Sequence, residues 1–182
     1  MKLEIKSAIR HMVQGLAHWM AFRSEMSNIQ LIEADAVLVA LDILRANLPH
    51  DYVIEREVTK KSASCVNNLQ RIDLGIKSRK DDSYICLIEF KLADATNGGY
   101  SKDVEKLSNI KLANKDIDCL VVILYRRSSL FTEPKEFVLA NGTAQKRTIH
   151  INKANVKVRH VCSSYGSSKA AMSKKTICLE VL

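Results

Sequence analysis

The chain has 182 residues, with 28 Lys and Arg against 20 Asp and Glu, which gives a formal net charge of +8. Its 47% hydrophobic and 26% charged residues are typical of a globular domain that is long enough for one hydrophobic core. No apolar run approaches the ~20 residues of a membrane span, and the first residues lack the apolar core of a signal peptide, so a membrane or secreted protein is disfavoured and a cytoplasmic location is expected.

The first sixty residues predict two helices and a strand. Apolar residues recur at helical spacing over 3–26, which indicates an amphipathic helix. Ser27 and Asn28 offer an N-cap for a second helix over 29–46. A strand is predicted over 52–58, so the chain begins as helix, helix, strand.

The next two predicted strands carry the most informative charged residues of the chain. Apolar runs over 70–77 and 84–92 are joined by a short charged turn, which indicates a β-hairpin. Asp73 lies in the first run, and Glu89 and Lys91 lie near the end of the second, where residues two apart point to one face. Burying such charges is costly unless they pair or hold a metal, and two carboxylates suit Mg²⁺. The hairpin therefore predicts a metal-dependent phosphodiesterase site.

The elements after the hairpin are predicted from periodicity and turn residues. They are an amphipathic helix around 102–110, a buried strand over 119–125, a short helix over 133–140, two short strands over 146–152 and 156–161, a loop over 162–175 and a last strand over 176–182.

Nearly all of the net charge lies in the last quarter of the chain. Residues 141–182 contain eight Lys and Arg against one acid, and the rest of the chain is close to neutral. A one-sided charge attracts polyanions, so nucleic-acid contact is predicted, with Lys169, Lys174 and Lys175 as candidates. Arg71, on the strand face of Asp73, could contact a phosphate or merely neutralise that acid. A basic surface that only keeps the protein soluble is the alternative.

Asp73, the hairpin and the Glu89-x-Lys91 sequence resemble the signature of the PD-(D/E)XK nuclease superfamily, although Ile72 stands where the proline of the motif's name would be. Helix, three antiparallel strands, helix and strand over 29–125 also match the order of that family's core. The resemblance implies an α/β fold: a restriction-endonuclease-like core with a mixed central β-sheet flanked by helices and with two N-terminal helices. One domain is expected, made of an N-terminal helix (1–27), a catalytic core (28–125) and a basic C-terminal extension that completes the sheet (126–182).

The resemblance also implies a Mg²⁺-dependent nuclease, in the first instance an endonuclease, that hydrolyses DNA phosphodiester bonds. Asp73, Glu89 and the backbone carbonyl of Phe90 would hold Mg²⁺, with Mn²⁺ as the expected substitute, and Lys91 would lie beside the attacking water. Glu33, near the start of the second helix, is a further candidate catalytic acid and metal ligand, although the helix dipole explains an acid there equally well. DNA is the expected partner, no membrane is expected, and a homodimer is left open.

Three alternatives stay open from the sequence alone. Lys91 could form a surface salt bridge with Asp73 or Glu89 and have no catalytic role. A nucleic-acid-binding or scaffold protein on the same fold could bind without cutting, although the complete set of Asp, Glu and Lys favours an enzyme. An RNA-directed nuclease is the third, because nothing in the chain indicates how a 2′-hydroxyl would be read.

Overall fold

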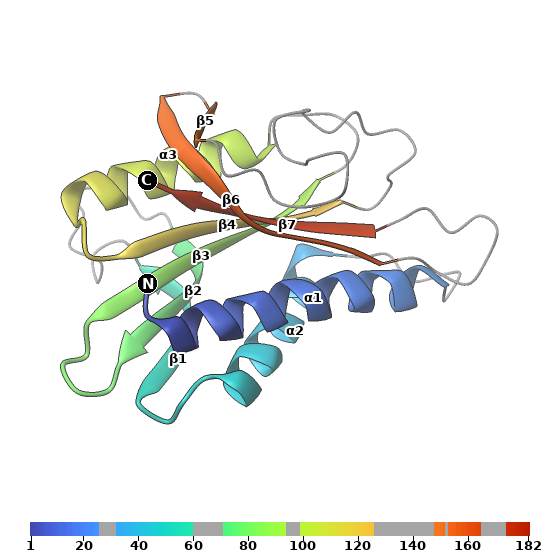
Figure 1. Cartoon of the computed structure of the whole chain (residues 1–182), viewed down its shortest axis with the longest axis horizontal. Helices are drawn as coiled ribbons and strands as arrows, with labels where there is room; N and C mark the ends of the chain where they lie inside the picture. The colour runs from blue at the N-terminus through green and yellow to red at the C-terminus, as the bar shows by residue number, and fades with distance from the viewer. Residues whose placement is uncertain (26–31, 60–70, 94–98, 126–147, 152, 165–173) are drawn as a thin grey trace.

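A mixed β-sheet between two helical layers forms the centre of the molecule (Figure 1). The computed structural model describes residues 1–25, 32–59, 71–93, 99–125, 148–151, 153–164 and 174–182. The helices are α1 (Leu3–Glu25), α2 (Glu33–Asn47) and α3 (Gly99–Ala113), and the strands are β1 (Tyr52–Thr59), β2 (Arg71–Ser78), β3 (Tyr84–Ala93), β4 (Asp118–Tyr125), β5 (Thr148–Ile151), β6 (Ala154–Ser164) and β7 (Lys174–Val181).

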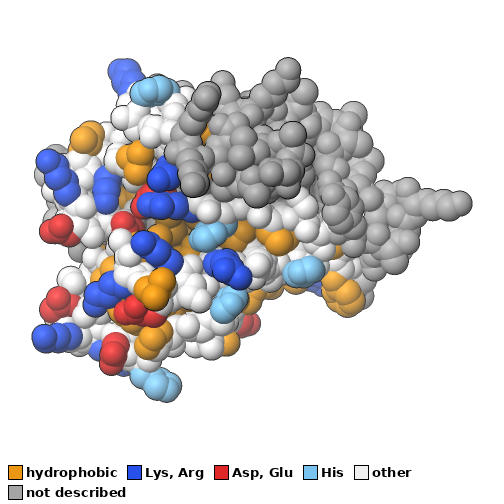
Figure 2. All heavy atoms as spheres, viewed as in Figure 1, with side chains coloured by type: hydrophobic (Ala, Val, Ile, Leu, Met, Phe, Trp, Pro, Cys, Tyr) orange, Lys and Arg blue, Asp and Glu red, His pale blue; other side chains and the backbone are white. Residues whose placement is uncertain are grey.

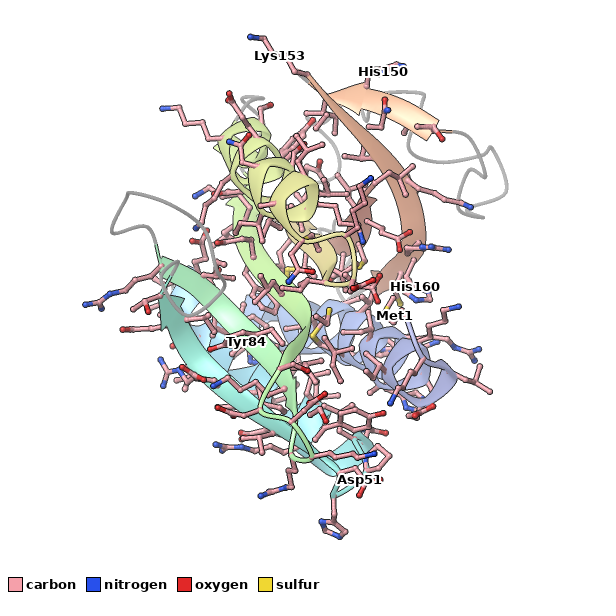
Figure 3. The ribbon with its side chains drawn as sticks, turned by 90° about the vertical axis from the view of Figure 1, so that its left-hand side faces the viewer. Met1, Asp51, Tyr84, His150, Lys153 and His160 are labelled. Carbon is pink, nitrogen blue, oxygen red and sulfur yellow. The ribbon has the colours of Figure 1, made fainter. Side chains whose placement is uncertain are left out.

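The strand order in the sheet is β1-β2-β3-β4-β7-β6-β5. Neighbouring strands are antiparallel except β3 and β4, which run parallel. Parallel neighbours require a crossover connection, and α3 lies in that connection. In Figure 3, Asp51 and Tyr84 mark the hairpin end of β1 to β3, and His150 and Lys153 lie at the distant β5–β6 edge.

The sheet has a hydrophobic core on each face. On one face α1 and α2 pack against even-numbered residues of β4, such as Leu120 and Val122. On the other face α3 packs against odd-numbered residues, such as Val121 and Ile123. All eight residues of β4 are buried, as expected for a central strand that is covered on both faces.

Gly15 lies where α1 and α2 approach each other closely. A Cβ atom added to Gly15 would lie 2.5 Å from Cδ1 of Ile43, a residue of α2. Arg23 of α1 also forms an ion pair with Asp35 of α2, with 3.7 Å between Nη2 and Oδ2. These contacts fix α2 against α1 and thereby place the first turn of α2 near the end of β3. Among the described residues, no helix is both long enough and apolar enough to cross a membrane.

The prediction of an α/β protein with a mixed sheet and flanking helices is confirmed. The predicted strands over 52–58, 70–77, 84–92 and 119–125 each differ from the observed strands by one residue at most at either end. Alternation and apolar runs identify these strands well, because β2, β3 and β4 lie inside the sheet and the edge strand β1 still buries Tyr52 and Val58.

Several predicted boundaries are wrong: α3 is longer at both ends than the helix expected around 102–110, and β6 begins at Ala154 instead of residue 156. The second helix is expected from residue 29, but Ile32 is extended (φ −117°, ψ 153°), so the helix begins at Glu33. The loop expected over 162–175 is too long, because β6 continues to Ser164 and β7 begins at Lys174. The two strands pair beyond the predicted ends, with Ser164 opposite Lys174. The helix expected over 133–140 lies outside the described residues.

Candidate active site

The candidate site lies where β2 and β3 separate. Their backbone pairing includes Leu74 opposite Ile88 and is not continued to Asp73. Instead, the Phe90 N–H donates a hydrogen bond to the Asp73 carboxylate, with 2.8 Å between N and Oδ2. The Asp73 side chain thus takes the place of a backbone acceptor at the end of the ladder. This contact fixes its carboxylate against the strand that carries Glu89 and Lys91.

Glu33 makes the equivalent contact two residues further along β3. The Leu92 N–H donates a hydrogen bond to the Glu33 carboxylate, with 3.0 Å between N and Oε2. The same oxygen lies 3.6 Å from Nζ of Lys91. Glu33 is the first residue of α2, where the helix dipole also favours a negative charge. The end of α2 is therefore joined to the strand segment that contains the Glu89-x-Lys91 sequence.

Glu89 forms an ion pair with a different lysine. Its Oε1 contacts Nζ of Lys106, which lies in α3 and also donates a hydrogen bond to the backbone carbonyl of Arg71. The side chains of Glu89 and Lys106 are only 6% and 13% exposed. A buried charge requires a partner, so each of these two groups holds the other in place.

Asp103 brings a fourth carboxyl group to the same region. It lies one helical turn before Lys106 in α3, and positions three apart share a helix face. Its Oδ2 atom is buried and has no hydrogen-bond partner among the described residues. Burial raises the pKa of Asp103, and the charges of Glu33 and Asp73 raise it further, while Lys91 and Lys106 act to lower it. The pKa of Asp103 therefore depends on the charges of these four neighbours.

The cluster has more acids than bases. Among the described residues, four carboxyl groups face two ammonium groups: those of Glu33, Asp73, Glu89 and Asp103 face those of Lys91 and Lys106. When all four acids are ionised, a divalent cation would neutralise the excess of two negative charges.

The pKa values of the two central acids are raised. Burial raises the pKa of Glu89 to about 8, Lys106 acts to lower it, and the charges of Asp73 and Asp103 raise it. Burial is also the main cause of the raised pKa of Asp73, while its hydrogen bond from Phe90 acts to lower it. The carboxyl groups therefore disfavour simultaneous ionisation in the absence of a further cation.

The donor atoms fit a hard cation that prefers oxygen. Asp73 and Glu89 supply two carboxyl groups, and Mg²⁺ is often held by only one or two carboxylates plus water and substrate oxygens. The Phe90 N–H points to Asp73. In an extended strand the carbonyl of the same residue points to the same side, so it is available on the side of Asp73. Across the described ranges, no group of three His, Cys, Asp or Glu side chains is arranged as a ligand set for a metal. The fit therefore depends on this pair of carboxylates and the carbonyl.

The structure thus brings together Glu33, Asp73, Glu89 and Lys91, which the sequence singles out, with the Phe90 backbone between the last two. Arg71 is different, because its side chain is 67% exposed and pairs with Glu57 of β1, with 2.6 Å between Nη1 and Oε2. Arg71 contributes its backbone carbonyl to the cluster, through Lys106.

The predicted basic contacts fall largely outside the described structure. Lys169 lies outside the described residues, and Lys174 and Lys175 belong to β7, although their side chains lie outside the description. On the face seen in Figure 2, described basic side chains lie next to acidic ones.

Asp103 and Lys106 are not among the predicted site residues. Both lie in the amphipathic segment over 102–110, and both flank its buried apolar residues Val104 and Leu107. Charged residues that border an apolar stripe are a usable signal of a buried ion pair. The sequence does not show, however, which strand the helix would cover.

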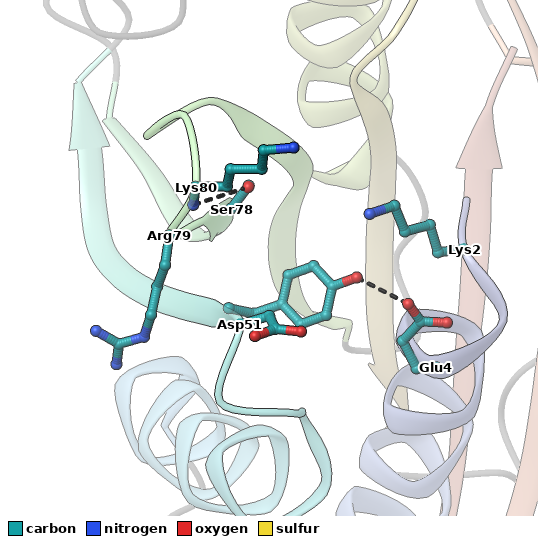
Figure 4. Close-up of a pocket in the computed structure, with 7 residues that line it drawn as sticks. Lys2, Glu4, Asp51, Ser78, Arg79 and Lys80 are labelled. Atoms are coloured by element: carbon teal, nitrogen blue, oxygen red, sulfur yellow. Dashed lines mark hydrogen bonds between the residues drawn. The ribbon is translucent and has the colours of Figure 1, made fainter.

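A pocket of about 470 Å³ lies at the other end of β2 (Figure 4). Its lining residues come from the start of α1, the start of β1 and the β2–β3 turn; they are Lys2, Glu4, Asp51, Tyr52, Ser78, Arg79 and Lys80. The Tyr52 hydroxyl donates to Glu4 at 2.8 Å, and Arg79 Nε donates to the His50 carbonyl at 2.7 Å. None of the residues that line this pocket belongs to the acidic cluster.

In comparisons with protein-family models, with curated proteins and with solved structures, nothing matches this chain.

Proposed function

We propose that this protein is a Mg²⁺-dependent nuclease that hydrolyses phosphodiester bonds in DNA, and that α2, β1, β2, β3, α3 and β4 form a restriction-endonuclease-like core. One observation carries the proposal. Asp73 and Glu89, from neighbouring strands, meet in a partly buried cluster with two more carboxyl groups than ammonium groups. The order of these six elements agrees with the core order that the sequence resemblance implies.

Each residue of the cluster has a distinct part in the proposed reaction. Asp73, Glu89 and the Phe90 carbonyl would hold Mg²⁺, with Glu33 as a further acid near Lys91. When bound, the cation would polarise the phosphate and lower the pKa of a water molecule. Lys91, whose side chain is one-third exposed, would stabilise negative charge on the attacking water and the scissile phosphate. Glu33 holds Lys91 at the end of β3, where it can meet a substrate from solution.

A non-cleaving nucleic-acid-binding protein is the second candidate. The observation that favours it is that Asp73 and Glu33 accept hydrogen bonds from the Phe90 and Leu92 N–H groups, which gives both acids a structural role. Such a protein would retain the acids without catalysis.

Incubation of the purified protein with supercoiled, linear and single-stranded DNA separates the two candidates. Cleavage is expected with Mg²⁺ or Mn²⁺ and is expected to disappear when EDTA removes the metal, because the carboxylates alone do not activate water. The products should be resolved on denaturing gels, with RNA of the same sequence in parallel. DNA binding without cleavage at every Mg²⁺ and Mn²⁺ concentration would favour the second candidate.

The basic C-terminal segment is proposed to track the nucleic-acid backbone. Reversal of Lys169, Lys174 and Lys175 to Glu is expected to weaken DNA binding at all sequences. For each phosphate that the variant no longer neutralises, the slope of log Kd against log salt should also become shallower, by about 0.9 on duplex DNA. Fluorescence anisotropy over a series of salt concentrations measures both effects.

The matched control reverses three exposed lysines elsewhere, Lys6, Lys80 and Lys115, and so changes the net charge by the same amount. If the two triple variants give the same binding curves, the change in net charge alone explains the weaker DNA binding. If the binding curve of the C-terminal variant overlays that of the wild type at each salt concentration, these lysines do not contact DNA and serve solubility only.

A further inference from the structure

Lys106 is the lysine that contacts Glu89, whereas Lys91 pairs with Glu33 on the more exposed side of the cluster. We propose that Lys106 is a built-in counter-ion that takes the place of a metal beside Glu89, so that a divalent cation must compete with its ammonium group. The proposal rests on the proposed function, because it assumes that Glu89 is a metal ligand. It assigns to Lys106 a positioning role that sets the metal affinity of the site.

The environment of Lys106 supports this role. Its ammonium group is held by one carboxylate and one backbone carbonyl, those of Glu89 and Arg71, and its side chain is 13% exposed. Val104 and Leu107 are fully buried beside it in α3, so the helix backbone cannot easily carry the ammonium group away. Moving a buried ammonium group away from its carboxylate partner is costly. Lys106 is therefore fixed where a cation bound by Glu89 would be repelled.

The direction of the effect follows from Coulomb's law. A positive charge within a few Å of a divalent cation raises the free energy of the bound state, even at the dielectric constant that is effective near a protein surface. Removal of this charge should therefore tighten metal binding by about tenfold or more. A residue that merely supported the ligands would give the opposite result, since its loss would loosen the site and weaken binding.

The experiment titrates the metal-free protein with Mn²⁺ and measures free Mn²⁺ by electron paramagnetic resonance. Lys106→Met removes the charge, and Lys106→Gln removes it but keeps an N–H that can donate to the Arg71 carbonyl. Lys111→Met is the matched control, because Lys111 lies on the same helix, donates to the carbonyls of Lys115 and Ile117 at 2.9 Å each, and lies near Asp118 instead of the cluster. Circular dichroism during heating shows whether each variant is folded, and Gln replaces Met if the Met variant is not.

Tighter Mn²⁺ binding by the Lys106 variants, with Lys111→Met like the wild type, is the expected result. It would also support the proposal if a Lys106 variant bound Mn²⁺ where the wild type binds too weakly to measure. If the wild type binds Mn²⁺ and the folded Lys106 variants bind equally or more weakly, the counter-ion role is wrong and the proposed function stands. If neither the wild type nor any variant binds Mn²⁺, both proposals are wrong.

Discussion

Asp73→Asn combined with Glu89→Gln is expected to lower the rate of DNA cleavage by at least about a thousandfold while the protein stays folded. The amides have nearly the size of the acids, and the amide oxygen at position 73 can still accept the hydrogen bond from Phe90 that closes the end of the β2–β3 ladder. The negative charges that would hold the cation are lost. Single-turnover cleavage of plasmid DNA in Mg²⁺ measures the effect.

Glu55→Gln is the matched control for this double variant. Glu55 is a paired carboxylate of β1, with its Oε2 2.8 Å from Lys77 Nζ and 2.8 Å from the Tyr84 hydroxyl, and it lies outside the cluster. Its loss is expected to leave cleavage unchanged. Lys91→Met, in contrast, should lose cleavage but retain Mn²⁺ binding, because Lys91 is proposed to stabilise charge on the scissile phosphate and not to bind the metal. A folded double variant that cuts as fast as the wild type would rule out the assigned site.

In the absence of divalent cations, the free energy of unfolding is expected to fall as the pH rises from about 5 to about 8. Glu89 has a pKa of about 8 in the folded protein, against an ordinary value of 4.5. Between these values the folded state binds the proton more tightly than the unfolded state, so stability is lost as the pH rises. Asp73 and Asp103 have raised pKa values and contribute with the same sign. The total loss should be on the order of a few kcal/mol.

Urea denaturation at several pH values within this window measures the loss. Glu89→Gln should flatten the curve, because the amide has no proton to lose in this pH window. His160, whose pKa is lowered by burial, contributes with the opposite sign, and the difference between wild type and variant removes its effect. Glu55→Gln should leave the slope as it is. Equal slopes for the wild type and Glu89→Gln would show that Glu89 ionises normally.

Part of the candidate site can be read from the sequence because strand geometry is regular. Side chains two apart on a strand share a face, and a short turn forces two strands to pair, so Asp73, Glu89 and Lys91 can be placed together. Their partners cannot. The contact of Lys91 with Glu33 depends on where α2 begins, and the contact of Glu89 with Lys106 depends on how α3 is rotated above the sheet. Neither property is encoded in the local pattern of residues.

The strands in the middle of the sheet can also be predicted from the sequence, whereas the strands that complete the sheet cannot be assigned to their neighbours. β4 can be predicted as a strand because residues 119–125 are all apolar, but nothing in this run shows that its second neighbour is β7, a strand far along the sequence. Pairings between distant segments depend on tertiary packing, which short-range periodicity does not reveal. The predicted start of α2 is wrong for a related reason. Ser27 and Asn28 are good capping residues in the sequence, but Ile32 is extended and the helix begins at Glu33.

The position of β7 beside β4 has a consequence for the order in which the chain is synthesised. When only the first 125 residues have left the ribosome, all elements that bear the acidic cluster exist, yet β4 has an open edge and α1 lacks β6 and β7, against which it packs. An exposed apolar strand edge is prone to wrong pairing with other chains. The nascent polypeptide should therefore acquire its native sheet only after β7 has emerged, which delays assembly of the proposed DNA-cutting centre until well after its own residues have been made.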